Sequence, residues 1–135
     1  MDSGWFQTIW PGRLLTKMML MPKDNKEILL KGNAAISAGD YEGFLELCTE
    51  DTVWEFVGDR VLRGKQQVRE YMASVYVEPP RFDVSELIAE GEFVVAVGEI
   101  QLLEKGIWNS YDYCDVWRFE NGLMACLRGF VVPKK

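Results

Sequence analysis

The clearest structural signal lies in residues 107–132, which read IWNSYDYCDVWRFENGLMACLRGFVV. Aromatic and β-branched residues recur on both sides of Asn121-Gly122, a dipeptide typical of hairpin turns. The residues before this stretch continue the strand pattern, with short glycine-containing loops between the segments. Four antiparallel strands are predicted, at residues 82–89, 93–103, 107–119 and 123–132. They form a continuous meander.

Helical periodicity dominates the residues before the meander. Asp24 is expected to cap a helix over residues 25–38, and Asp40 a second helix that ends at Leu47. A strand over residues 52–57 and a loop to Gly64 follow. A third helix over residues 65–75 ends before Pro79-Pro80. Three helices followed by a meander predict an α+β fold, in which the helices cover one face of a strongly curved sheet. The concavity between the two layers is the expected place for a small-molecule site.

Composition narrows the possible partners and chemistry. The chain of 135 residues is 48% apolar and 27% charged, which fits one domain with its own core. Its net charge of -6 argues against nucleic acid and anionic membranes as partners. Because there is no histidine, triads built on histidine are excluded. No phosphate-binding glycine loop or metal-spaced acid cluster is present, so we expect no cofactor and no metal. The three cysteines form no Cys-x-x-Cys motif and predict reduced thiols and a cytoplasmic protein.

Residues 1–22 are predicted to be an N-terminal extension, with the domain formed by residues 23–135. Apolar side chains occur at helical spacing within the extension, so we expect two short helical turns that pack on the domain. These are Trp5, Phe6, Ile9, Trp10, Leu14, Leu15, Met18 and Met19. In an alternative interpretation, Met18, Met19 or Met21 is the natural start.

The last hairpin allows two registers with different functional consequences. With a two-residue turn at Asn121-Gly122, Asp115 faces Arg128 and forms an ordinary ion pair. With a three-residue loop over residues 120–122, Asp115 lies beside Leu127 instead. We favour the second register because it opposes large and small side chains, placing Tyr113 over Gly129. There Asp115 has no evident cation, and a buried carboxyl of this kind tends to keep its proton and donate a hydrogen bond.

Several motifs carry a resemblance to a known superfamily. The motifs are Ala38-Gly39-Asp40-Tyr41, residues 49–55 (TEDTVWE), Arg63-Gly64-Lys65, residues 115–119 (DVWRF), Asn121-Gly122 and Arg128-Gly129-Phe130. Together they resemble the nuclear transport factor 2-like superfamily and, within it, the SnoaL-like polyketide-cyclase and ketosteroid-isomerase branch. The resemblance spans residues 28–132. It implies a cone-shaped α+β fold, an apolar pocket and a homodimer.

The resemblance carries over to the site only in part. Asp115 coincides with the acid that ketosteroid isomerases keep protonated to bond a substrate oxyanion, a general example of a carboxyl held neutral by its apolar site. The general base of those enzymes falls on Phe56, and their companion tyrosine falls on Gly32. The aspartate of limonene-epoxide-hydrolase-like members falls on Gly129. Without a base, the isomerase proton shuttle is not expected here.

The resulting hypothesis is a homodimer that binds a small, mostly apolar carbonyl- or hydroxyl-bearing molecule. Asp115 is the expected catalytic or hydrogen-bonding acid, with isomerase-, cyclase- or hydrolase-like chemistry if the protein is an enzyme. The expected ligand-binding residues are Trp54, Phe56, Ile100, Leu102, Tyr113, Trp117, Leu127 and Gly129. The expected dimer face carries Val116, Arg118, Cys126, Arg128 and Phe130. The alternative is a non-catalytic binding or scaffold protein whose cavity is filled by its own aromatic side chains.

Overall fold

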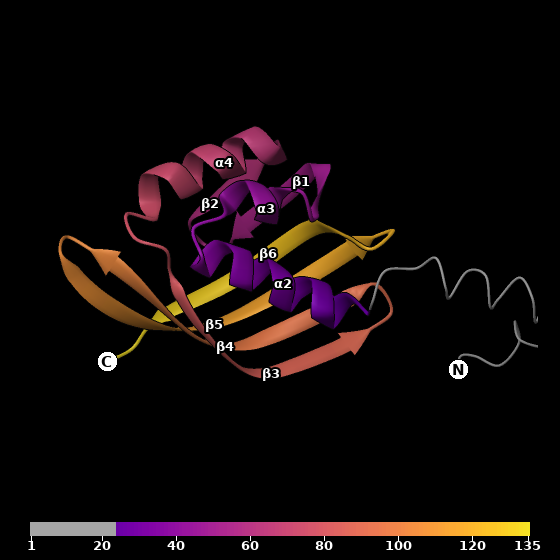
Figure 1. The fold of residues 1–135 in the computed structure, drawn as a ribbon. Coiled ribbons are helices and arrows are strands. Elements are labelled where there is room, and N and C mark those ends of the chain that lie inside the picture. Colours follow the sequence, from indigo (N-terminus) through magenta and orange to yellow (C-terminus); the bar gives the residue numbers. More distant parts are fainter. Residues whose placement is uncertain (1–23) are drawn as a thin grey trace, which may run out of the picture.

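The fold was analysed in a computed structural model, which describes residues 24–135 (Figure 1). Its elements in chain order are α2 (Asn25–Ser37), α3 (Tyr41–Leu45), β1 (Cys48–Phe56), β2 (Arg60–Arg63), α4 (Gly64–Val75), β3 (Arg81–Glu90), β4 (Phe93–Glu104), β5 (Ile107–Glu120) and β6 (Leu123–Pro133). The predicted packing of residues 1–22 on the domain lies outside the described residues and stays a prediction. None of the helices between residues 24 and 135 has the length and hydropathy needed to span a membrane.

The sheet contains six strands in the order β2-β1-β6-β5-β4-β3. The predicted meander over β3 to β6 is confirmed, with antiparallel pairing between successive strands. Two features differ from the sequence-based expectation. Residues 60–63, expected to lie in a loop, form β2 and pair antiparallel with β1, while β1 pairs parallel with β6. The observed architecture is therefore α+β, as predicted, but its sheet is mixed.

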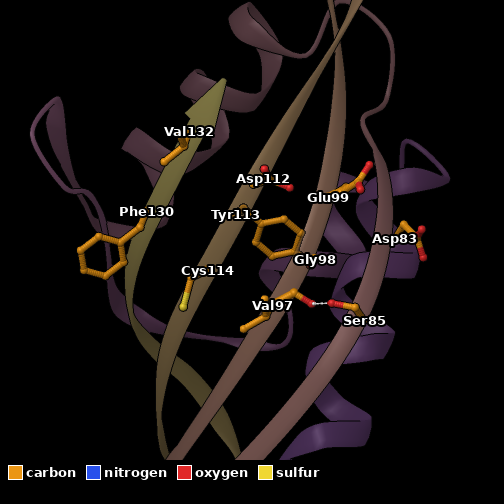
Figure 2. Close-up of a pocket in the computed structure, with 10 residues that line it drawn as sticks. All are labelled: Asp83, Ser85, Val97, Gly98, Glu99, Asp112, Tyr113, Cys114, Phe130 and Val132. Carbon is orange, nitrogen blue, oxygen red and sulfur yellow. Dashed lines mark hydrogen bonds between the residues drawn. The ribbon is translucent and has the colours of Figure 1, made fainter. Parts of the chain in front are cut away.

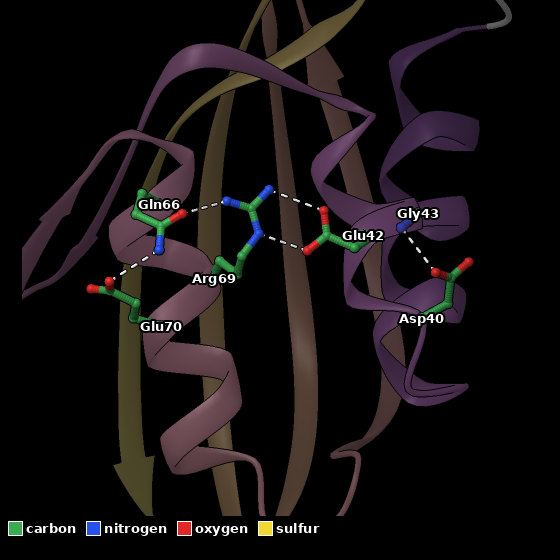
Figure 3. A network of polar contacts seen from close by, with 6 residues as sticks. All are labelled: Asp40, Glu42, Gly43, Gln66, Arg69 and Glu70. Atoms are coloured by element: carbon green, nitrogen blue, oxygen red, sulfur yellow. Dashed lines mark hydrogen bonds and ion pairs between the residues drawn. The ribbon is translucent and has the colours of Figure 1, made fainter.

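The expected helix caps are present. The Asp24 side chain accepts a hydrogen bond from the Glu27 amide at 3.1 Å, and Asp40 accepts one from the Gly43 amide at 2.9 Å (Figure 3). Each aspartate thereby satisfies one of the backbone N–H groups that a helix start leaves free. The two caps set the residues at which α2 and α3 begin.

The helices lie together on the concave side of the curved sheet (Figure 1). The helix α2 packs across β3 and β4, and α4 packs on β1. The Arg69 guanidinium of α4 holds both carboxylate oxygens of Glu42 in α3, at 2.7 and 3.0 Å, and also bonds Gln66 (Figure 3). Because the pair is exposed, it contributes little to stability, and the buried apolar faces of the two helices hold them in place.

The core fills the space between the two layers. Fully buried side chains come from every helix and from the inward face of the sheet, including Leu29, Phe44, Val68, Met72, Val94, Phe119 and Met124. Gly32 of α2 faces Phe44 so closely that an added Cβ would lie 3.2 Å from its ring. The position matched to the companion tyrosine of ketosteroid isomerases is therefore occupied by neighbouring core side chains.

The hairpin between β5 and β6 follows neither predicted register along its whole length. Its turn has two residues, Asn121 at φ 50° and Gly122 at φ 78°, so the favoured three-residue loop is wrong. Glu120 opposes Leu123 at the turn, but one extra residue in β6 shifts the register beyond Phe119. As a result Asp115 opposes Gly129, rather than Leu127 or Arg128.

This β-bulge decides which β6 side chains share a face with Asp115. A shift of one residue moves every side chain of a strand to the other face of the sheet. Arg128 therefore points to the outer face, where its parallel neighbour is Glu55, and cannot pair with Asp115. The prediction that Asp115 faces the apolar interior with Tyr113 and Trp117 on its strand is confirmed, although the predicted pairing partners are wrong.

Candidate functional site

An apolar cavity lies between α2 and the concave face of the sheet. Its walls come from α2, α3, β1, β3, β4, β5 and β6, together with the segment that follows α4. The lining residues are Asn33, Ile36, Phe44, Trp54, Phe56, Tyr76, Phe82, Ile100, Tyr113, Asp115, Trp117, Leu127 and Val131. The cavity thus joins segments that are up to about a hundred residues apart in the sequence.

Most of the predicted site residues meet at this cavity. Asp115 lines it, and so do Trp54, Phe56, Ile100, Tyr113, Trp117 and Leu127. Leu102 does not line it and instead packs against the edge of the core. Gly129 lies directly behind the Asp115 carboxyl, since a Cβ added to it would be 3.1 Å from Asp115 Oδ1.

Six lining residues were not among those predicted from the sequence, namely Asn33, Ile36, Phe44, Tyr76, Phe82 and Val131. Asn33 lies four residues after Leu29 and three before Ile36, both of which are buried. A polar residue at such a position of a helix is a signal that the sequence does contain. Phe82 belongs to the inward face of a predicted strand and was also recognisable. Tyr76 follows the end of α4, where no periodicity indicates the direction of a side chain.

Asp115 is the only carboxylic acid among the described residues that line this cavity. No cation and no hydrogen-bond donor pairs with its carboxyl within residues 24–135. Burial among apolar groups disfavours the ionised form and raises the pKa of Asp115 from 3.8 to about 7. Near neutral pH the site therefore contains both the neutral acid and the carboxylate.

Phe56 and Gly129 lie at the two positions where the resemblance would place a second acidic or basic group beside Asp115. Phe56 pairs with Gly129 across β1 and β6, and Gly129 in turn opposes Asp115 in β5. A Cβ on Gly129 would lie 3.6 Å from the Phe56 ring. The three residues thus form one row across the sheet, with a single titratable group in it. This row can supply an acid but no second carboxylate to act as its base.

Trp54 is the centre of an aromatic cluster that closes one side of the cavity. Its ring contacts Phe44, Phe56, Tyr71 and Trp117 edge to face, with centroid separations of 5.5, 5.9, 6.2 and 6.3 Å. Such arrangements are favourable for aromatic pairs and restrict ring motion. The cluster gives this wall a defined shape.

Two phenols add polarity to the cavity. Burial and the nearby Asp115 carboxylate raise the pKa of Tyr113 well above its usual range. Burial, together with the neighbouring Tyr71, Asp115 and Tyr41, has the same effect on the pKa of Tyr76. Both phenols therefore stay protonated at every physiological pH and can donate hydrogen bonds.

The volume of the cavity is about 50 Å³. Sites for small molecules and cofactors typically measure roughly 300–1,000 Å³, whereas one water needs only about 10–15 Å³. The cavity as it stands therefore accommodates water or one end of a ligand. Tyr76 and Val131 are the lining residues best placed to make more room, since Tyr76 lies beyond a helix end and Val131 is 42% exposed.

The outer face of the sheet carries a second and larger hollow, of about 360 Å³ (Figure 2). Apolar side chains from Val97, Cys114, Phe130 and Val132 form its floor, and Asp83, Glu99 and Asp112 lie around it (Figure 2). Lys134 bridges Glu99 and Asp112 at 3.2 Å each. This surface includes Phe130 of the expected dimer face. Its three carboxylate residues are exposed to solvent.

Within residues 24–135, no three cysteine or carboxylate side chains are arranged to hold a metal ion. The cysteines in this range, Cys48, Cys114 and Cys126, are not disulfide-bonded.

Comparisons with known proteins agree with this architecture. The SnoaL-like domain family matches residues 31–127. A search of curated protein sequences finds no match. Among solved structures, the fold resembles that of SalBIII, with a TM-score of 0.76. SalBIII is an epoxide hydrolase/cyclase-like enzyme with a role in pyran ring formation in the polyether salinomycin. It is 21% identical, with 83% of this chain and 97% of SalBIII covered.

Two further structures show the same fold. An NTF2-like protein of unknown function from Burkholderia pseudomallei has a TM-score of 0.71 at 21% identity, over 80% of this chain and 90% of its own. An LEH-like epoxide hydrolase from M. tuberculosis has a TM-score of 0.71 at 16% identity, over 78% and 80%. At these identities the structures establish the fold alone. Since the family match covers most of the chain, the protein belongs to the SnoaL-like domain family and has the NTF2-like α+β fold.

Proposed function

We propose that this protein binds a small, mostly apolar molecule with a carbonyl or hydroxyl group in the cavity beneath α2. Asp115 serves that group as a hydrogen-bond donor or as a general acid. The observation that carries the proposal is the Asp115 carboxyl itself, which faces an apolar cavity without a partner in the described residues and has a pKa of about 7. Strongly raised pKa values of this kind cluster at functional sites.

The chemistry that suits the site needs an acid and no paired base. A group with a pKa near 7 is present as the neutral acid in a large part of the population at neutral pH and transfers its proton readily. In a reaction that fits, Asp115 gives its proton to an epoxide oxygen while a hydroxyl of the same molecule attacks an epoxide carbon and the C–O bond at that carbon breaks. The proton of the attacking hydroxyl then returns to the Asp115 carboxylate, so the cyclisation needs no second base. SalBIII is an epoxide hydrolase/cyclase-like enzyme and the M. tuberculosis protein an LEH-like epoxide hydrolase, and this supports the choice of reaction class. A proton shuttle through a second carboxylate does not fit, because Phe56 and Gly129 take the neighbouring positions.

The small volume of the cavity favours a second candidate function. In this alternative the aromatic side chains fill the cone permanently and the protein is a non-catalytic scaffold. A cavity of about 50 Å³ is what this alternative expects. The two candidates differ in one property: a ligand-binding protein must open this cavity for a molecule larger than water.

A titration with a small ketone tests the proposal. The full chain is labelled in its methyl groups, and cyclopentanone and the oxygen-free methylenecyclopentane are added in turn. Saturable shifts of the Ile100 and Leu127 methyl resonances are expected, because both side chains line the cavity. Val131→Phe should prevent them by filling the exposed side of the cavity. Its control, Val132→Phe, places the same ring on the outer face and should leave them intact. If neither probe shifts the cavity methyls in the wild-type protein, the scaffold candidate is correct instead.

We further propose a homodimer formed through the outer face of the sheet and a cytoplasmic location. The outer face carries Val116, Arg118, Cys126, Arg128 and Phe130, a mixture of apolar and charged side chains typical of such interfaces. The proposed location rests on the three reduced cysteines.

A further inference from the structure

Two hydrogen-bond donors of the cavity wall have no partner. The Trp54 indole Nε1 and the Tyr113 hydroxyl are buried and form no hydrogen bond within residues 24–135. Trp54 is 2% exposed and Tyr113 is 4% exposed, and both residues line the cavity. Buried polar groups in proteins are nearly always paired, because an unpaired buried donor destabilises the folded state. Two unpaired donors at one small cavity indicate that these groups form their hydrogen bonds with a bound ligand.

The chemistry of these groups restricts that occupant. An indole N–H can donate a hydrogen bond but cannot accept one. The Tyr113 hydroxyl can do both, and it keeps its proton because burial raises its pKa. That proton has no acceptor among the described residues. Asp115, in its neutral form, presents one more O–H. These three groups offer donors to an occupant, beside the Asn33 amide, which can both donate and accept.

We propose that Trp54 and Tyr113 are specificity-determining residues that select ligands by a buried acceptor oxygen, such as a ketone, ester or epoxide oxygen. This inference rests on the proposed function and narrows its ligand class, because an alcohol must also find an acceptor for its own hydrogen. Trp54 is fixed by four aromatic neighbours and cannot turn its N–H to solvent without disturbing the core. Tyr113 is held edge to face against Phe82 at 6.1 Å. The donors are therefore preorganised for an acceptor that arrives with the ligand.

The same pair of probes tests this inference separately from the proposed function. Cyclopentanone and methylenecyclopentane have similar shapes and differ in the oxygen. Cyclopentanone is expected to bind the full chain several-fold more tightly and to shift the Trp54 indole proton resonance downfield. Cyclopentanol should bind less tightly than the ketone.

Variants of Trp54 and Tyr113 that keep Asp115 test whether these two donors cause the preference for the ketone over the alkene. Tyr113→Phe removes only the hydroxyl and should weaken cyclopentanone binding roughly three- to tenfold, as expected for one hydrogen bond, without changing the Kd of methylenecyclopentane. Trp54→Phe reshapes the cavity wall as well, so its readout is the ratio of the two affinities, and the preference for the ketone should fall. Trp117→Phe, which shortens another indole of the wall, should preserve that ratio. Equal affinity for ketone and alkene, with the indole proton unmoved, would overturn the inference while ligand binding stands. Failure of both probes to bind would refute the proposed function and this inference with it.

Discussion

Replacing Asp115 by asparagine is expected to make the protein more stable at alkaline pH and to leave it unchanged in acid. Asparagine has nearly the same shape as the neutral acid and carries no titratable group. The pKa of Asp115 rises from 3.8 in the unfolded chain to about 7 in the folded protein. The folded state therefore binds more protons than the unfolded state between these two values. Wild-type stability is then lost as pH rises through this range, whereas the variant lacks this contribution.

The size of the effect follows from the two pKa values. One pKa unit corresponds to about 1.4 kcal/mol, so a rise from 3.8 to about 7 corresponds to roughly 4 kcal/mol at full ionisation. With a urea m-value of about 2 kcal/mol/M, the midpoint of the variant should exceed that of the wild type by roughly 2 M at pH 8. At pH 4 the two midpoints should nearly coincide, because the carboxyl is then protonated in the folded protein.

Urea unfolding at pH 4, 5, 6, 7 and 8, followed by tryptophan fluorescence, measures this difference directly. Asp112→Asn is a suitable control, since Asp112 lies three residues earlier in β5 on the outer face and pairs with Lys134. Removing that ion pair should slightly reduce stability at neutral pH, whereas Asp115→Asn should increase it. A constant difference between pH 4 and pH 8, or an Asp115→Asn variant less stable than the wild type at pH 8, would refute the argument that the carboxyl is desolvated and unpaired.

Four further predictions concern stability and assembly. Tyr113→Phe should leave stability unchanged or raise it, because it removes an unpaired hydroxyl. Tyr111→Phe breaks a hydrogen bond to a carboxylate and should reduce stability by about 1 kcal/mol, measured by the same unfolding assay. Gly98→Ala should destabilise by about 3 kcal/mol or prevent folding, since its Cβ would lie 2.2 Å from the backbone oxygen of Asp83; an unchanged midpoint would contradict this close approach. The wild-type chain should sediment as a dimer at micromolar concentration and Phe130→Asp as a monomer; a wild-type mass of one chain would count against the proposed interface.

The sequence was sufficient to predict the layers of the fold because these depend on local signals. Asp24 and Asp40 cap helices as expected, and glycine-containing turns separate the strands of the meander. The strand β2 was missed because it has only four residues, two of them arginines, and offers no clear alternation. The parallel pairing of β1 with β6 joins residues more than seventy positions apart and depends on how the sheet closes, which no local pattern encodes.

The candidate site, like the fold, was predictable where local patterns decide it and not where long-range packing does. Inward-facing residues of single strands, such as Trp54, Tyr113 and Trp117, follow from alternation. The cross-strand neighbours of Asp115 depend on the β-bulge in β6. Neither predicted register included this bulge, because a bulge a few residues beyond a turn leaves the turn sequence unchanged. Tyr76 reaches the cavity from irregular chain after α4, so its contribution depends on tertiary packing alone.

The central claim is that an apolar cavity raises the pKa of Asp115 to about 7. Its carboxyl carbon resonance, followed by NMR from pH 2 to pH 9 and assigned with Asp115→Asn, tests this claim most directly. A titration midpoint near 7 is expected, because burial is the cause of the raised pKa and no described residue pairs with the carboxylate. A midpoint at or below 3.8 would show that the carboxylate is stabilised in the folded protein, and would contradict the assignment of Asp115 as the acid of the site.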